Sequence, residues 1–156
     1  MLKQYQTQLQ TDAVRVNSTF FDITTTVRTG TANIIDNQNY WKLFNQPYSQ
    51  ESASAYKRIK AEISTYHANT AALSSIGVYT TNPAIPECDY IHVLPDGFDQ
   101  QPWYSKLSSD EYNTWLVADY TDRFGHSNCE LTLVEKLVLK NSPYDTYLVT
   151  RLDTNY

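Results

Sequence analysis

The stretch MLKQYQTQLQTDAVRVNSTFFDITTTVRTGTANII, residues 1–35, carries the strongest pattern in the chain. Apolar residues recur every seven positions in two neighbouring rows. The first row is Leu2, Leu9, Val16 and Ile23, and the second is Ala13, Phe20, Val27 and Ile34. Because residues four apart lie on one helix face, the two rows form a single apolar stripe. The pattern predicts a helix of about 35 residues, which would be about 50 Å long at 1.5 Å per residue.

Two interpretations of this helix are open. Its seven-residue period is typical of a coiled coil, but the stripe is wider than a strict coiled-coil seam. We therefore expect the helix to pack on its own domain, with a dimer partner at its start. The alternative is the longest helix of an ordinary helical bundle. The far end, with Thr24–Thr26 and Gly30, is expected to fray or bend. A helix that starts uncapped at residue 1 also predicts a continuation upstream.

Composition narrows the class of protein. The 156 residues suit one domain, 1–156, with a net charge of −5 and no cluster of Lys and Arg, which argues against nucleic acid as a partner. The 13 Tyr and three Trp suit either a binding surface or half-buried strands. There is no run of about 18 apolar residues, so no membrane span is expected within the chain. No apolar signal-peptide core follows Lys3.

The two cysteines, Cys88 and Cys129, leave a disulfide possible. In an oxidising compartment it would close a loop of about forty residues and stabilise the fold by about 3–4 kcal/mol. Two unpaired thiols are the alternative, because sequence spacing does not fix geometry.

A second helix is predicted over about residues 50–73, capped by Ser49. Its apolar face consists of Tyr56, Ile59, Ile63, Tyr66, Thr70 and Leu73. Between the two helices, the cluster at Tyr40–Phe44 predicts a short helical turn that ends before Pro47.

From residue 74 the pattern changes to β-branched and aromatic runs that predict five strands. They are residues 74–81, 90–94, 114–117, 130–139 and 146–152. A short helix is expected within residues 100–113 and a turn-rich connection over residues 119–128. The chain therefore predicts an α+β domain, with helices over about 1–73 on one side of a five-strand antiparallel sheet core over about 74–153.

This order of elements resembles the Cache-type extracellular sensor domain of bacterial two-component sensor histidine kinases. The residues that carry the resemblance are Ser75–Tyr79, Trp103, Tyr104, Trp115, Glu130–Leu139 and Tyr147–Val149. The resemblance implies a PAS-like sheet held outside the cell membrane, with one membrane helix before the chain and another after it. It further implies a homodimer through the first helix.

The resemblance also implies a small-molecule pocket on the curved face of the sheet, under the segment that holds Trp103 and Tyr104. Amino-acid-binding members have an Arg two residues before that pair, where this chain has Gln101, and a later Asp, for which Asp119 is a possible counterpart. Gln carries no charge, so a neutral, hydroxyl-rich ligand or an accessory solute-binding protein is expected instead. The implied ligand-binding residues are Tyr79, Gln101, Trp103, Tyr104, Trp115, Asp119 and Tyr120.

Simpler roles are open for each of these residues. Trp103 and Tyr104 would also suit core packing. Tyr79 and Trp115 are expected to be neighbours on strands, and a role within the strands is the alternative to lining the pocket. Asp119 and Tyr120 would also suit a solvated loop.

Catalysis is not expected. The histidines, His67, His92 and His126, lack metal-site spacing, and no nucleophile-elbow, metalloprotease, P-loop or dinucleotide motif is present. No cofactor is expected either. Besides a kinase sensor, the alternatives are the sensor domain of a chemoreceptor and a structural cell-surface module that dimerises through the first helix.

Overall fold

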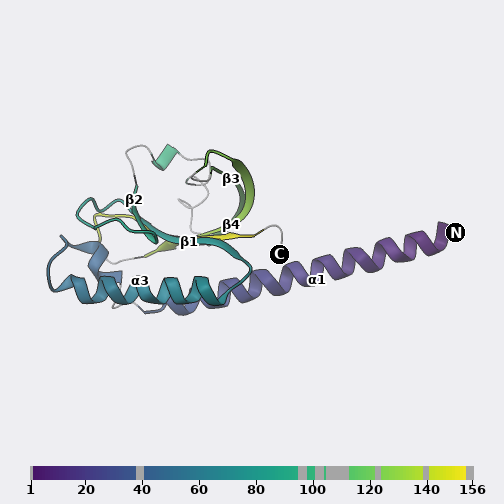
Figure 1. Ribbon diagram of the computed structural model, residues 1–156, viewed down its shortest axis with the longest axis horizontal. Coiled ribbons are helices and arrows are strands. Elements are labelled where there is room, and N and C mark those ends of the chain that lie inside the picture. Colours follow the sequence, from purple (N-terminus) through teal and green to yellow (C-terminus); the bar gives the residue numbers. More distant parts are fainter. Residues whose placement is uncertain are drawn as a thin grey trace. The chain divides into compact units, whose positions relative to one another are not determined.

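The computed structural model describes residues 2–37, 41–94, 98–100, 104, 113–121, 124–138 and 141–153. The chain divides into two compact units, Met1–Ile34 and Ile35–Tyr156. The first unit is helical, and the second holds the sheet with its remaining helices (Figure 1).

Helix α1, Leu2–Ile35, confirms the predicted long helix. Its threonine-rich part was expected to fray or bend, yet the helix runs without a break to Ile35. The threonine hydroxyls donate to carbonyls one turn back, as Thr24 does to Phe20 (2.9 Å) and Thr29 to Thr25 (2.9 Å). These bonds satisfy the hydroxyls within the helix without stabilising it, and the low helix propensity of threonine is too weak a preference to end the helix here.

Two shorter helical elements follow: the 3-10 helix η1, Lys42–Asn45, and helix α3, Ser52–Asn69. The first matches the predicted turn after Tyr40. The second ends four residues before the predicted position 73, because Leu73 already pairs with Leu152 in the sheet. Ser49 does not cap α3 with its side chain. Its hydroxyl lies 3.2 Å from that of Ser52 instead.

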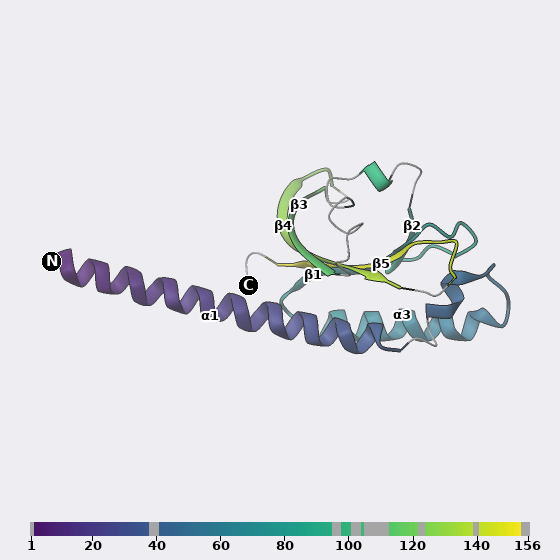
Figure 2. The ribbon, with the colours of Figure 1, turned by 180° about the vertical axis from the view of Figure 1, so that it is seen from behind.

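The described residues form a five-stranded sheet of order β2-β1-β5-β4-β3. The strands are β1 Leu73–Thr80, β2 Ile91–Val93, β3 Asn113–Thr121, β4 Ser127–Leu137 and β5 Thr146–Leu152 (Figures 1 and 2). The predicted α+β class is confirmed, but the purely antiparallel sheet is wrong. Strand β2 runs parallel to β1, with the Val78 amide bonded to Tyr90 O and the Leu94 amide bonded to Thr80 O, each at 2.8 Å.

The two faces of the sheet are distinguished by their position relative to helix α3. Helix α3 lies along one face in both ribbon views (Figures 1 and 2). Tyr66 of α3 is close enough to the Glu135 carboxylate of β4 to interact electrostatically with it. Since successive strand residues point to opposite faces, the register places a set of buried residues on the same, helix-facing side. They are Ile76, Val78, Leu133 and Leu148.

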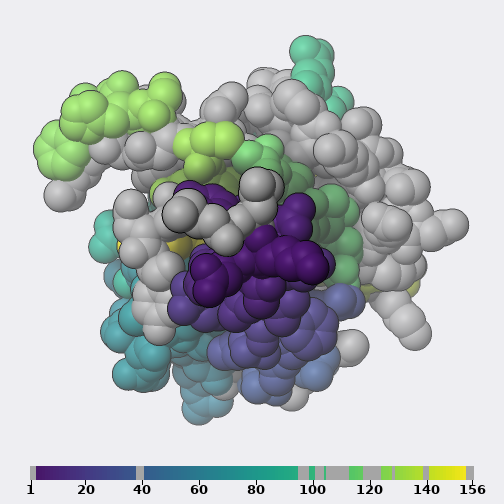
Figure 3. All heavy atoms as spheres, turned by 90° about the vertical axis from the view of Figure 1, so that its right-hand side faces the viewer, coloured from purple at the N-terminus to yellow at the C-terminus, as the bar shows by residue number. Residues whose placement is uncertain are grey.

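The β3–β4 region is more regular than predicted. Strand β3 extends to Thr121 and β4 begins at Ser127, so half of the expected loop over 119–128 is strand. Gly125, at φ 84°, supplies the left-handed backbone of the turn between them. This turn, light green in Figure 3, projects from the surface.

Candidate functional site

A row of four side chains crosses the sheet on the face opposite α3. His92 of β2 pairs in register with Tyr79 of β1, Tyr79 with Tyr147 of β5, and Tyr147 with Lys136 of β4. The His92 and Tyr79 rings lie 4.9 Å apart between centroids, and Lys136 Nζ lies 5.9 Å from the Tyr147 ring centroid. Cross-strand neighbours on one face contact each other directly, so these four residues form one continuous surface. We call it the aromatic row.

Gly77 makes room beside this row. A Cβ at Gly77 would lie 3.4 Å from both His92 Cδ2 and Tyr79 Cε2, and 3.5 Å from Tyr90 O. Both rings therefore lie against bare backbone, as glycine allows where side chains approach the main chain closely. A larger side chain at Gly77 would displace one ring or both.

The row has a buried floor and a half-buried rim. Tyr147 is 0% exposed and belongs to a buried cluster with Leu116, Val134 and Val149. Tyr79, Leu94 and Tyr104 are half-buried and pack against this cluster. The Tyr104 ring meets the Tyr147 ring edge to face, with centroids 6.4 Å apart. Ring surfaces and phenol groups thus meet at a partly accessible edge, a pattern that small-molecule sites share.

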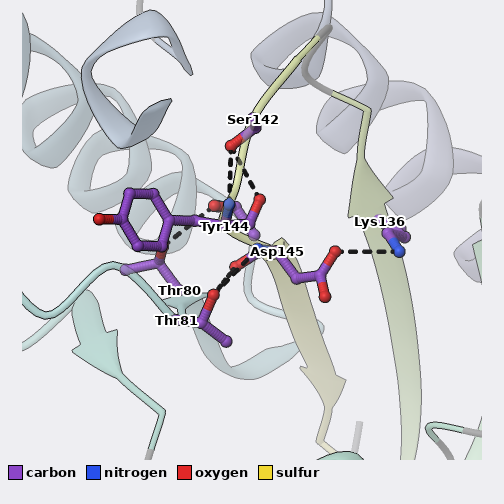
Figure 4. Close-up of polar contacts among 7 residues, drawn as sticks. Thr80, Thr81, Lys136, Ser142, Tyr144 and Asp145 are labelled. Atoms are coloured by element: carbon purple, nitrogen blue, oxygen red, sulfur yellow. Dashed lines mark hydrogen bonds and ion pairs between the residues drawn. The ribbon is translucent and has the colours of Figure 1, made fainter. Parts of the chain in front are cut away.

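A set of polar contacts holds one end of the row (Figure 4). The Asp145 carboxylate lies 3.1 Å from Lys136 Nζ, while the Asp145 backbone exchanges two 2.9 Å hydrogen bonds with Thr81. Asp145 therefore ties β4 to the end of β1. Because the ion pair is partly exposed, it adds little stability and acts mainly by fixing the position of Lys136.

The row carries little net charge at neutral pH. Burial is the main cause that raises the pKa of Tyr147 well above its ordinary value, and the nearby Asp145 charge and Tyr104 hydroxyl raise it further. Tyr147 is therefore a neutral phenol, and the Lys136 charge is balanced by Asp145. This face therefore presents ring surfaces and hydroxyl groups to a ligand rather than a strong electrostatic field.

The raised pKa predicts a loss of stability at high pH. Above about pH 10 the tyrosines of the unfolded chain release their protons, while Tyr147 in the folded chain keeps its own. The folded state then binds more protons, so the free energy of unfolding falls as pH rises. In Tyr147→Phe this fall should be smaller, with a remainder from Tyr56 and Tyr66, whose pKa values burial also raises. Urea unfolding from pH 8 to 11 measures it, and equal slopes in both proteins would contradict it.

Two of the predicted ligand-binding residues lie together on this face, namely Tyr79 and Tyr104. Trp115 does not join them. It pairs with Leu133, which points to the helix-facing side, and β5 and β4 separate its strand from β1. The expectation that Tyr79 and Trp115 are neighbours is therefore wrong, because sequence patterns do not fix the order of strands.

The remaining predicted residues are less defined. Gln101 and Trp103 lie outside the described residues. Asp119 and Tyr120 are in β3, opposite Cys129 and Asn128 in the register, and not in the solvated loop that was their alternative. Their side chains lie outside the described part of the chain.

Sequence reasoning missed three members of the row and its polar anchor, which are His92, Lys136, Tyr147 and Asp145. The three members of the row sit on predicted strands, but only the strand register brings them together.

Cys88 and Cys129 are free thiols, so the possible disulfide is not formed. Cys88 is half-buried near the Tyr56 hydroxyl, while Cys129 is exposed on β4. Among the described residues no group of three His, Cys, Asp or Glu side chains is placed to hold a metal ion. Within that same part of the chain, every helix is too short or too polar to cross a membrane.

Comparison of the chain with protein-family models, curated proteins and solved structures finds no significant match.

Proposed function

We propose that this domain is the sensing module of a membrane-bound histidine kinase and binds a small molecule on the face that carries the aromatic row. The observation that supports this most is the combination of a buried Tyr147 floor with three half-buried rings beside it, those of Tyr79, His92 and Tyr104. Ring faces with polar tips at a partly accessible edge suit ligand contact better than they suit a closed core.

The ligand class is a neutral, hydroxyl-rich molecule such as a sugar or short oligosaccharide. Its C–H faces would lie on the Tyr79 and His92 rings, and its hydroxyls would bond the phenols. An anionic ligand is less suited, because Lys136 already has the Asp145 carboxylate 3.1 Å away. In a variant of this proposal, the small molecule binds an accessory solute-binding protein. That protein then docks on the same face of this domain.

The domain would lie on the outer face of the cell membrane and act as a homodimer through α1. Three residues of the α1 stripe, Leu9, Val16 and Phe20, are 53–64% exposed, which leaves an apolar surface for a second copy. Ligand binding would change the relative stability of two arrangements of this dimer, and such couplings are typically about 1–3 kcal/mol. A chemoreceptor output is compatible with the same site.

The exposed stripe of α1 also favours a second candidate function, a structural interaction module at the cell surface without a small-molecule ligand. In that case the aromatic row would serve packing alone, and no ligand would change the stability of the domain. The two functions therefore differ in one measurable property.

A thermal-shift screen with amino acids, carboxylates, sugars and short oligosaccharides tests the proposal. We expect a neutral, hydroxyl-rich compound to raise the melting temperature, since a ligand at 100 times its Kd stabilises the fold by about 2.7 kcal/mol. The shift should vanish in His92→Ala, because that substitution removes the ring that lies against Tyr79.

His67→Ala is the matched control. His67 is also half-buried and also contacts a tyrosine ring, Tyr90, at 5.9 Å, but it belongs to α3. It should keep the ligand shift. Equal loss in both variants would place the ligand elsewhere, and a blank across the whole panel would contradict direct sensing of these compounds and leave the structural module.

A further inference from the structure

Asn82 is a fully buried polar side chain that the binding proposal does not use. It is 0% exposed and follows the end of β1 by two residues. Its side-chain amide donates to the carbonyls of Phe44 (2.9 Å) and Gln46 (3.0 Å), and its carbonyl oxygen accepts from the Ala84 amide (3.1 Å). A buried Asn with these bonds fixes the parts it joins, because breaking any of them leaves a polar group unsatisfied.

On one side, Asn82 is linked to the two strands that carry the tyrosines of the aromatic row. Its backbone amide donates to Thr80 Oγ1 (3.2 Å), which shares a 3.1 Å hydrogen bond with Thr146 Oγ1. Both threonines are fully buried. They directly follow Tyr79 and precede Tyr147, on the opposite face of β1 and β5. Any displacement of these two tyrosines therefore acts on the threonine pair.

On the other side, Asn82 holds η1 and the segment just after it. Trp41, which directly precedes η1, stacks on Phe44 with ring centroids 5.7 Å apart. Its indole N–H donates to the carbonyl of Ile35, the last residue of α1, at 3.0 Å. Hydrogen bonds and one ring contact thus run without interruption from Thr146 to the end of α1.

We propose that Asn82 is the coupling residue of the domain: it links the β1–β5 pair under the aromatic row to η1 and, through Trp41, to the end of α1. This rests on the proposed function only for the source of the displacement, a ligand on the row. The mechanical link itself exists without ligand. It gives the sensing face a defined connection to the helix that would carry the signal.

Hydrogen exchange of the ligand-free protein, read by mass spectrometry on a peptide covering residues 41–47, tests the link. Thr146→Val keeps the side-chain volume but removes the hydroxyl at the far end of the chain of bonds. We expect exchange in η1 to rise roughly fivefold, the factor that corresponds to one hydrogen bond of typical net strength. Thr146→Ser, which restores the hydroxyl, should return it to the original rate.

Thr150→Val is the matched control, because Thr150 is equally buried on the same face of β5 and its hydroxyl has no hydrogen-bond partner among the described residues. It should leave η1 unchanged, and a β4 peptide over residues 131–137 should be unaffected in every variant. In Asn82→Ala, exchange in η1 should already be high, and adding Thr146→Val should change nothing.

The proposal is overturned if Thr146→Val and Thr150→Val act alike, if η1 and β4 respond equally, or if Thr146→Val acts as strongly in Asn82→Ala as in the original chain. If Asn82→Ala does not fold, the comparison of Val and Ser at Thr146 decides alone. No ligand is used, so a blank ligand screen and a failed exchange test are separate outcomes.

Discussion

Replacing Tyr147 with alanine is expected to lower the free energy of unfolding by about 3–5 kcal/mol, the range for removing a fully buried aromatic ring. Tyr147 is completely buried and contacts the Tyr104 ring, the Lys136 ammonium and the cluster around Val134. The cavity that alanine leaves cannot close fully, because the strands of the sheet fix its walls on one side. Urea unfolding monitored by circular dichroism measures the change.

Tyr144→Ala is the control for this substitution. Tyr144 lies three residues earlier, in the half-buried turn before β5, where its backbone rather than its ring makes the hydrogen bonds with Ser142. Its loss should cost at most about 1 kcal/mol. If the two alanine variants were equally stable, Tyr147 would not be the floor of the site.

Trp41→Ala is the second substitution with a large expected effect, again about 3–5 kcal/mol. Trp41 is only 2% exposed, stacks on Phe44 and donates its indole N–H to Ile35. Trp41→Phe should recover much of the lost stability, because it keeps an aromatic ring on Phe44. It should not recover all of it, because the Ile35 carbonyl loses its indole donor. The unfolding free energies of both variants, taken from urea titrations, check this order.

Trp115→Ala provides the comparison, because Trp115 is half-buried and lies on β3, the strand at one edge of the sheet. It should cost clearly less than Trp41→Ala. The reverse order would mean that η1 is not firmly packed against the rest of the second unit, and the coupling path through Trp41 would lose its basis.

The local elements of this fold were predictable because their signals are local. The seven-residue period predicted the length of α1, and the spacing of apolar residues predicted the position of α3. Runs such as Thr146–Leu152 identified strands, and here the prediction matches β5 from end to end. Errors arose where a tertiary contact overrides a local preference. Leu73 leaves the helix pattern because it pairs with Leu152 in the sheet. The expected fraying of α1 was wrong for a local reason, since the low helix propensity of threonine is only a weak preference.

The site was harder to predict, because it depends on strand order and register. Nothing in the segment between β1 and β2 revealed that the chain returns to add a parallel strand, which brings His92 beside Tyr79. Likewise Lys136 and Tyr147 meet only through the β4–β5 register. Tyr79 and Tyr104 were predicted as ligand-binding residues through a family resemblance, and they lie near each other in the structure. Trp115 was assigned to the wrong neighbours, because its position depends on the strand order and register.

Amide chemical-shift mapping of the ¹⁵N-labelled protein, titrated with the sugar or oligosaccharide that gives the largest thermal shift, tests whether a ligand binds on the aromatic row. We expect the largest changes at Gly77, Tyr79 and His92 and in β5 around Tyr147, with little change in α3. Changes confined to α3 or α1, or no saturable change at millimolar concentrations of these compounds, would contradict it.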